Sequence, residues 1–256
     1  MAGTTTRARV LFGSASALSI ISSVIVSPAL AQVTVLDAIT IVATRTEELA
    51  INALAPVSIV RGEQIQQSQA NKTSDLFFGM PGVSFQQRGD DPASAINIRG
   101  LQDFGRVAVL IDGARQNFQR TGHNADGQFY IDPAMIGGID VVRGPHANIY
   151  GSGAIGGVVT FRTKDVEDVI SPGQKWGVLS NFEVGSNTFR GATSHFFASR
   201  PNANTDVLFG GSYRDNHNYK DANGFEWLNT ANTNYSGVFK TTFRPSEGHE
   251  LKFGLL

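Results

Sequence analysis

Cysteine is absent from the 256 residues, and only 17% of the residues are charged. The absence of cysteine excludes disulfides, thiolate metal sites, cysteine nucleophiles and the lipid-bearing cysteine of a bacterial lipoprotein. The formal net charge of -1 leaves no electrostatic basis for binding nucleic acid. Few charges together with 28 glycines are typical of a protein rich in strands and turns.

Long apolar runs are also missing, except near the N-terminus. Arg7 and Arg9 precede an apolar stretch over 10–26, and Ala29-Leu30-Ala31 follows as a small-residue cleavage pattern. This order predicts a cleaved export signal over 1–31, with a mature chain from Gln32. The alternative is a transmembrane helix, but the stretch is short and rich in serine. A mature protein that spans a membrane would therefore use strands.

Residues 32–54 predict an extended N-terminal segment and linker. Their apolar residues alternate loosely with polar ones, and no turn pins them to a neighbour. A free β-prone segment is suited to strand addition onto a partner. The alternative is an ordinary first strand of the next domain.

Residues 55–165 predict a compact α+β domain. Asp112-Gly113 is a turn signal, and Asp132 before Pro133 predicts an N-cap with proline at the first helical position. A helical turn over 73–78 is stopped by Pro81-Gly82. Short apolar runs predict strands at 57–60, 83–85, 96–98, 107–111, 139–142 and 157–161.

Residues 175–256 change to strict alternation of apolar and polar side chains. Strands of about ten residues, apolar on one side and polar on the other, are typical of a transmembrane β-barrel. The connections 200–205 and 245–250 are short, whereas 215–234 is long and polar, as outer-membrane barrels require. The alternative is a soluble antiparallel sheet with one wet face. One face is expected to carry Trp176, Val178, Phe182, Val184, Phe189, Thr193, Phe197, Val207, Phe209, Tyr213, Tyr235, Phe239, Thr241, Phe243, Leu251, Phe253 and Leu255.

The letters from Gly151 to Gly156 match the dinucleotide-binding pattern G-x-G-x-x-G. That site needs a helix to open from the glycines, whereas Gly157 to Phe161 is β-branched and strand-like. Tight backbone packing accounts for these glycines better.

Residues 39–44, 98–100, 109–113, 141–145 and 150–158 form several motifs in order and at normal spacing. Through these motifs, about residues 36–256 resemble TonB-dependent outer-membrane receptors. The resemblance implies an α+β plug domain followed by antiparallel transmembrane β-barrel strands, about five of an expected twenty-two. It implies a TonB box at Ile39, Thr40, Ile41, Val42 and Ala43. It also implies plug motifs at Arg99, Gly100, Asp112, Gly113, Arg143, Gly144, Pro145, Tyr150, Gly151, Gly153, Gly156 and Gly157.

Within that family the chain is similar to the heme and hemoglobin receptors, through residues 112–116, 121–124 and 132–133. The resemblance implies that His123 is an axial heme ligand, and His217 in the long polar connection is a weaker candidate. Imidazole is a good iron ligand, although a lone histidine in a polar loop is usually only solvated. Arg99 and Arg143 are expected to pair with carboxylates on the inner wall of the barrel.

These inferences describe a non-enzymatic receptor in the bacterial outer membrane that imports heme, free or from hemoglobin. Its partners would be TonB with the ExbB–ExbD motor and outer-membrane lipid. Heme would be transported cargo, with no permanently bound cofactor and no metal except the heme iron. The alternatives are a ferric-siderophore receptor, a soluble periplasmic plug module, and a non-functional truncated fragment, since five strands cannot close a barrel.

Overall fold

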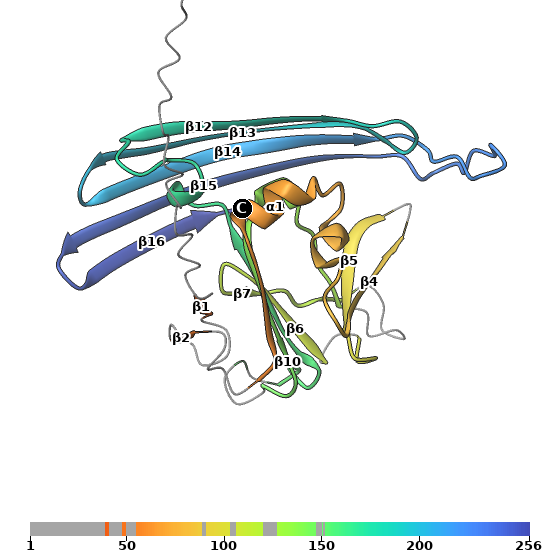
Figure 1. The fold of residues 1–256 in the computed structure, drawn as a ribbon, viewed down its shortest axis with the longest axis horizontal. Helices are drawn as coiled ribbons and strands as arrows, with labels where there is room; N and C mark the ends of the chain where they lie inside the picture. The colour runs from red at the N-terminus through yellow and green to blue at the C-terminus, as the bar shows by residue number, and fades with distance from the viewer. Residues whose placement is uncertain are drawn as a thin grey trace, which may run out of the picture. The chain divides into compact units, whose positions relative to one another are not determined.

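The computed structural model describes residues 39–40, 48–49, 55–88, 91–102, 106–119, 127–146, 150 and 152–256. They form an α+β unit, here called the plug unit (55–170), and a five-stranded antiparallel sheet, here called the wall sheet (Figure 1). A separate two-residue pairing joins β1 (Ile39–Thr40) to β2 (Glu48–Leu49). The start of the predicted coupling segment is therefore paired within the chain, whereas Ile41, Val42 and Ala43 lie outside the described residues.

The plug unit is built on one mixed sheet of order β3-β10-β11-β6-β7. Strand β10 runs antiparallel to both β3 and β11, and the central strand β11 runs parallel to β6. The strands are β3 (Val57–Arg61), β6 (Val107–Ile111), β7 (Ala114–Arg115), β10 (Ile136–Arg143) and β11 (Gly157–Thr163). Strands β10 and β11 are buried on both faces. Their sequences therefore lack the alternation of a half-buried strand and consist mostly of β-branched and small residues.

The remaining elements of the plug unit cover this sheet and its edges. A hairpin of β4 (Val83–Arg88) and β5 (Asp91–Ile98) stands beside it (Figure 1). The others are α1 (Gly62–Ser68), η2 (Thr73–Phe77), β8 (Phe118–Gln119), β9 (Gly127–Gln128), η3 (Pro133–Met135) and η4 (Val166–Asp168). Phe77, Phe85, Phe129 and Phe161 pack as rings at the centre of the core. The expected strands and the Asp132 N-cap of η3 are confirmed, and α1 is an element that the sequence pattern did not predict.

Two plug motifs are tight turns in which both central residues have positive φ. Arg99 (φ 53°) and Gly100 (φ 85°) are enclosed by two hydrogen bonds between Ile98 and Leu101. Asp112 (φ 47°) and Gly113 (φ 83°) join β6 to β7 in the same way. Turns of this kind match the right-handed twist of hairpin strands, which explains the glycine at the second position.

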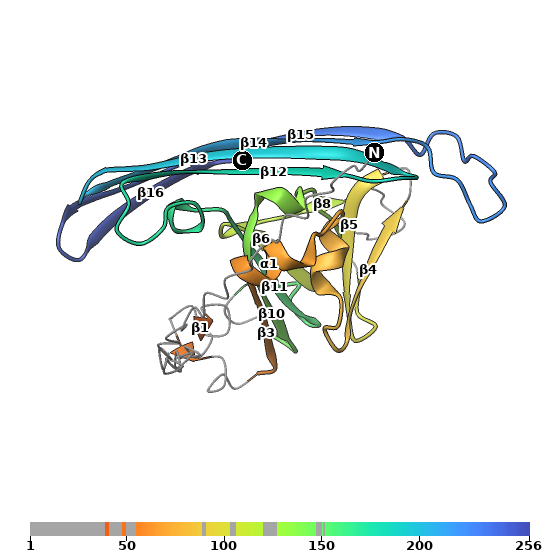
Figure 2. The ribbon, with the colours of Figure 1, turned by 45° about the horizontal axis from the view of Figure 1, so that its top comes forward.

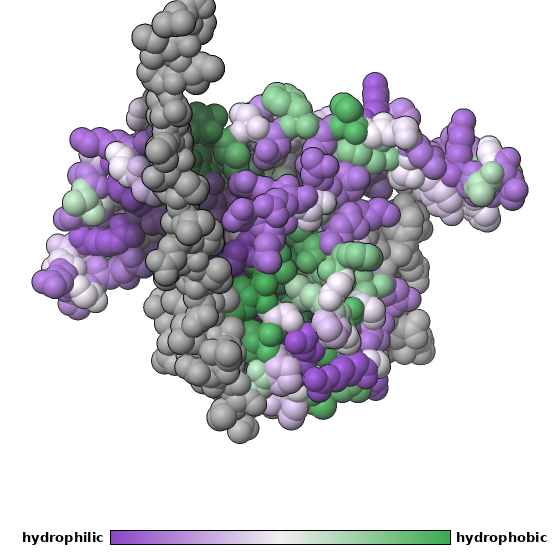
Figure 3. Space-filling view, viewed as in Figure 1, coloured by the Kyte–Doolittle hydropathy of each residue, from purple (hydrophilic) through white to green (hydrophobic). Residues whose placement is uncertain are grey.

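The wall sheet follows the chain order β12-β13-β14-β15-β16. Its strands are β12 (Trp176–Val184), β13 (Phe189–Asn202), β14 (Thr205–Asn216), β15 (Asn232–Ser246) and β16 (His249–Leu255). Two-residue turns at 203–204 and 247–248 lie at one end, and the connections 185–188 and 217–231 lie at the other (Figures 1 and 2). The surface around the β15–β16 turn and around the tip of 217–231 is mostly hydrophilic (Figure 3).

The predicted alternation of the wall sheet is confirmed with one correction. The register places Val178, Phe197, Phe209, Phe239 and Leu255 in one row, on the face turned away from the plug unit. Phe189 was expected on that face and is not there. A bulge between Phe189 and Gly191 shifts the pairing by one residue, and a one-residue shift moves a side chain to the opposite face.

Within the described residues, no helix is both long enough and apolar enough to cross a membrane.

Candidate functional site

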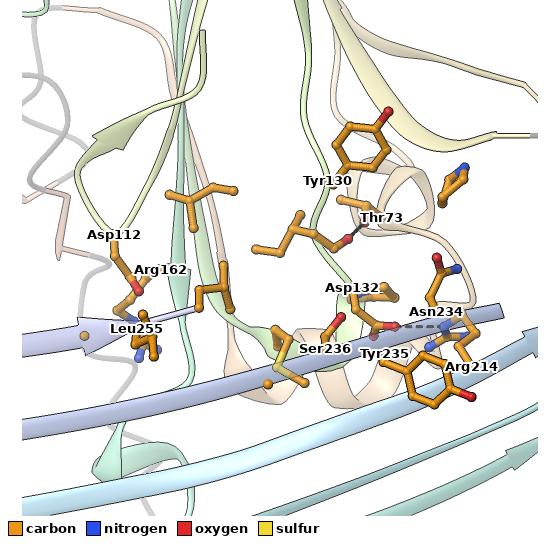
Figure 4. A pocket seen from close by; sticks show the side chains of 18 of the residues that line it. Thr73, Asp112, Tyr130, Asp132, Arg162, Arg214, Asn234, Tyr235, Ser236 and Leu255 are labelled. Carbon is orange, nitrogen blue, oxygen red and sulfur yellow. Dashed lines mark hydrogen bonds and ion pairs between the residues drawn. The ribbon is translucent and has the colours of Figure 1, made fainter. Parts of the chain in front are cut away.

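A cavity of about 1200 Å³ lies between the plug unit and the inner face of the wall sheet. Figure 4 places Asp112 and Arg162 toward one end of it, and Asp132, Arg214 and Asn234 toward the other. The plug contributes residues of the β6–β7 turn and of the stretch that leads into η3, and the sheet contributes inner-face residues of β14, β15 and β16. The polar face predicted for these strands therefore lines an internal space rather than bulk solvent.

Asp112 connects three elements at one end of this cavity. Its carboxylate accepts hydrogen bonds from the Thr163 amide (2.9 Å) and hydroxyl (2.5 Å) at the end of β11. Lys240 of β15 forms an ion pair with Asp112 (3.2 Å) and donates to the Thr163 carbonyl oxygen (3.2 Å). The sequence identified the Asp112-Gly113 turn, and the structure adds that its aspartate contacts the wall.

Asp132 makes the second polar contact between the plug unit and the wall sheet. One carboxylate oxygen caps η3 by accepting from the Ala134 amide (2.8 Å), and the other accepts from Arg214 Nε of β14 (3.2 Å). The guanidinium of Arg214 also lies 3.7 Å from Glu183 and over the ring of Phe189, 5.2 Å from its centroid. The bulge that turns Phe189 inward thus provides the aromatic face on which this buried cation rests.

Apolar packing joins the same two parts of the chain. Met135, Val166 and Ile170 of the plug unit are buried with four inner-face residues of the wall sheet, namely Phe196, Ala198, Leu208 and Val238. Lys164 lies at this contact, where its ammonium donates to the Ile136 carbonyl oxygen (3.0 Å) and sits 5.3 Å from the centre of the Phe196 ring. Burial lowers the pKa of Lys164, and the carboxylate of Asp168 only partly offsets this effect.

Charged groups also cluster where the plug unit continues into the wall sheet. Arg200 contacts Asp206 (2.7 Å) and forms a two-oxygen contact with Glu167 (2.9 and 3.0 Å). Arg244 contacts the second oxygen of Asp206 (2.8 Å). In the plug unit, burial alone would lower the pKa of Arg162. The hydrogen bonds and charge of Asp168, together with the charges of Asp165 and Asp112, outweigh burial and raise this pKa. These pairs fix the connection near η4, close to the short-turn end of the sheet.

The structure describes only one of the two histidines that were predicted as heme ligands. His123 lies outside the described residues, so its assignment stays a prediction. His217 is described and exposed in the connection 217–231, with its ring 3.4 Å from Arg190 and 3.7 Å from Asp215. Among the described residues, no group of three or more metal-ligating side chains is arranged to hold a metal ion.

The two motif arginines lie near each other at the edge of the plug unit. Arg143 donates to the Pro81 carbonyl oxygen (3.2 Å), and burial and then the charge of Arg99 lower the pKa of Arg143. Across the part of the chain that the structure describes, neither arginine forms an ion pair. Their pairing with carboxylates of the barrel wall therefore stays a prediction, and the repulsion between them is a physical reason to expect such partners.

The other motif residues serve the local fold. Gly144, Pro145 and Tyr150 belong to the connection between β10 and β11, and the Tyr150 and Ser152 carbonyl oxygens accept hydrogen bonds from Arg115 (3.2 and 2.5 Å). Gly151 lies outside the described residues. Gly157 starts strand β11 rather than a helix, which confirms that the glycine pattern is not a dinucleotide site.

The contact residues Lys240 and Arg214 were predicted only as members of the polar face of the wall sheet. Their pairing with Asp112 and Asp132 joins residues 128 and 82 positions apart, which no local pattern can specify. The available signal is their position, because each is a charged residue on the polar face of a strand whose other face is apolar. An inward charge of that kind requires a partner from another element.

The family model described as TonB-dependent receptor plug domain matches residues 50–158. The plug unit belongs to this family of receptor plug domains. Among the relatives of the chain, the Yersinia pestis "Hemin receptor" is 33% identical over 191 residues, which cover 74% of this chain and 27% of that protein. The Haemophilus influenzae "Heme/hemopexin utilization protein C" is 35% identical over 161 residues, 63% of this chain and 21% of that protein. This chain thus spans about a quarter of the length of these relatives.

Solved structures agree with the fold. The Serratia marcescens hemophore receptor HasR, solved as a double mutant with its hemophore HasA and heme, matches with a TM-score of 0.70 and 30% identity. The match covers 77% of this chain and 30% of HasR. The ferric yersiniabactin receptor FyuA of Yersinia pestis matches with a TM-score of 0.59 and 16% identity, which indicates a shared fold alone. The plug unit and the wall sheet are therefore a receptor plug and strands of a receptor barrel.

Proposed function

We propose that this chain is the N-terminal part of an outer-membrane receptor that imports heme with energy supplied through TonB. The observation that carries the proposal is a plug unit seated against the polar inner face of a sheet whose opposite face is apolar and exposed. Such a sheet matches lipid on one side and a protein-filled lumen on the other. The heme assignment is supported by the similarity to hemin and heme receptors at about one third identity.

The finer elements of the proposal come from the sequence. Residues 1–31 direct export, and Ile39, Thr40, Ile41, Val42 and Ala43 present the strand that TonB captures, with ExbB–ExbD as the motor. His123 ligates the heme iron from the plug, and His217 is a weaker contact candidate on the outer loops. Heme, either free or held by hemoglobin, is cargo, so the receptor performs no covalent chemistry.

The ligand class is tested by measuring binding to the full-length receptor. This term means the receptor whose barrel is closed and whose N-terminal part is this chain. Hemin added to this purified receptor should shift its Soret band and saturate, because an axial imidazole changes the ligand field of the iron. A ferric siderophore should not compete. Saturable binding of a ferric siderophore without any Soret shift would replace heme with that ligand class.

A further inference from the structure

Two ion pairs hold the plug unit to the wall sheet on either side of one stretch of sequence. Lys240 of β15 holds Asp112, and Arg214 of the adjacent strand β14 holds Asp132. His123, the predicted heme ligand, lies between the two aspartates in the sequence. All four residues line the same cavity, and Figure 4 labels Asp112, Asp132 and Arg214 among them. The two pairs therefore hold this stretch of the plug to the wall sheet near both of its ends.

The two contacts differ in how much water reaches them. The side chains of Arg214 and Asp132 are 5% and 4% exposed, whereas those of Lys240 and Asp112 are 13% and 33% exposed. Separating a fully buried pair leaves two charges without water or partner, which is strongly unfavourable. Separating a partly hydrated pair allows water to replace the lost contact, so its net strength is small.

Their surroundings differ in the same direction. Arg214–Asp132 is supported by the Phe189 ring, the η3 cap and the neighbouring apolar cluster of Met135, Phe196, Leu208 and Val238. The ammonium of Lys240 contacts two polar groups, the carboxylate of Asp112 and the Thr163 carbonyl oxygen. One side chain thus holds both the β6–β7 turn and the end of β11, and breaking its contacts frees both from β15.

We propose that Asp112–Lys240 is the contact that opens when the plug rearranges for transport, while Asp132–Arg214 and the apolar cluster remain closed as the fixed side of that movement. This inference rests on the proposed transport function. Opening at Lys240 would enlarge the cavity already present toward the β15–β16 side of the wall sheet. The plug then partly detaches from this wall and does not leave it as a rigid body.

The absence of native cysteine makes site-directed linkage a direct test. Ala114→Cys and Gly254→Cys flank the proposed opening and leave Asp112 and Lys240 unchanged. A Cβ at position 254 would lie 3.8 Å from the Lys240 side chain, so the substitution fits. Glu167→Cys with Arg200→Cys forms the matched pair, because these two side chains are accessible and join the plug unit to the wall sheet beside Val166 of the apolar cluster. Each pair is joined in the full-length receptor by a short bifunctional thiol reagent that a reductant cleaves.

Linking positions 114 and 254 should lower hemin uptake by about tenfold or more, with recovery on reduction, whereas linking 167 and 200 should leave uptake within about twofold. Surface binding of hemin should persist in both. Equal loss with both linkages would mean that the whole plug leaves this wall, and uptake unaffected by the 114–254 linkage would mean that the Lys240 contact stays closed. Absence of hemin uptake even in the unmodified receptor would instead refute the proposed function.

A second measurement does not depend on linkage. In a receptor with the single buried thiol Ile111→Cys, adding Lys240→Met should raise the labelling rate of that thiol several-fold before any ligand is present. Lys252→Met is the control, because Lys252 lines the same cavity but pairs with Glu250 on its own strand. Equal labelling rates with Lys240→Met and without it would overturn the proposal.

Discussion

At the scale of single residues, the cargo assignment depends most on His123. A neutral imidazole binds heme iron directly, and the other histidine of the plug unit, His146, instead contacts the Gly144 carbonyl oxygen (3.2 Å). The neighbours of His123, Gly122 and Asn124, permit a tight, hydrated turn from which the ring can face outward. The assignment therefore yields a single-residue prediction.

His123→Ala in the full-length receptor should weaken hemin binding by about tenfold or more and change the Soret band, because the iron loses a strong ligand. Absorbance titration measures both quantities. His249→Ala, at the start of β16 on the short-turn side, is the matched control and should change neither. If His123→Ala behaves like that control, the iron ligand lies elsewhere.

Gly157 is the residue whose replacement should damage the plug fold most directly. Its φ of 153° is rarely adopted by other residues, and a Cβ there would lie 2.3 Å from the Val142 carbonyl oxygen and 2.8 Å from Ile98. Gly157→Ala should therefore destabilise the plug by about 3 kcal/mol, the upper range for overpacking. The measurement is labelling of a buried thiol, Ala108→Cys, across a urea series.

The control for that substitution is Gly237→Ala on β15, where a Cβ would meet nothing closer than 3.8 Å. The urea midpoint should fall for Gly157→Ala by roughly 1 M or more and remain unchanged for Gly237→Ala. Equal midpoints for the two variants would show that the β10–β11 register tolerates a side chain at position 157.

At the scale of elements, the coupling segment depends on its backbone. Strand addition uses amide and carbonyl groups, and proline removes a donor and fixes φ. Ile41→Pro in the full-length receptor should abolish hemin uptake and preserve surface binding, whereas Ile41→Ala, which keeps the amide, should retain most uptake. Uptake and binding are measured on the same cells. Parallel loss of both would make the segment structural instead.

The sequence predicted those elements whose cause is local. Alternation along β12 to β16 and the turn at Asp112-Gly113 follow from side-chain period and backbone φ, which are properties of a few adjacent residues. Helix α1 was missed because Gly62–Ser68 is a polar run with one buried residue, Ile65, so no helical period is visible.

The errors and omissions in the site have a different origin. Phe189 was misplaced because a bulge changes which face a residue occupies without changing the composition of the strand. Lys240–Asp112 and Arg214–Asp132 could not be predicted because they depend on how two separately patterned parts pack together. The charges themselves were visible, and only the three-dimensional fold supplies their partners.

At the scale of the whole molecule, the open edges of the wall sheet determine how this chain should behave when it is expressed alone. Among the described residues, β12 and β16 each pair on one side only, so the sheet has two open edges. Unpaired edges in lipid leave backbone donors and acceptors unsatisfied. We therefore expect residues 1–256 expressed alone to be exported and then to aggregate or be degraded. A heat-modifiable barrel band on gel electrophoresis, or growth on hemin from this chain alone, would contradict this expectation.

TonB-dependent accumulation of hemin tests the central claim most directly. Labelled hemin is supplied to receptor-deficient cells that express the full-length receptor, with and without a functional TonB. The account predicts accumulation inside cells with TonB, and only surface-bound hemin when TonB is absent, because binding requires the receptor alone whereas passage requires the captured N-terminal segment. Equal accumulation in both strains, or none in either despite an assembled receptor, would contradict it.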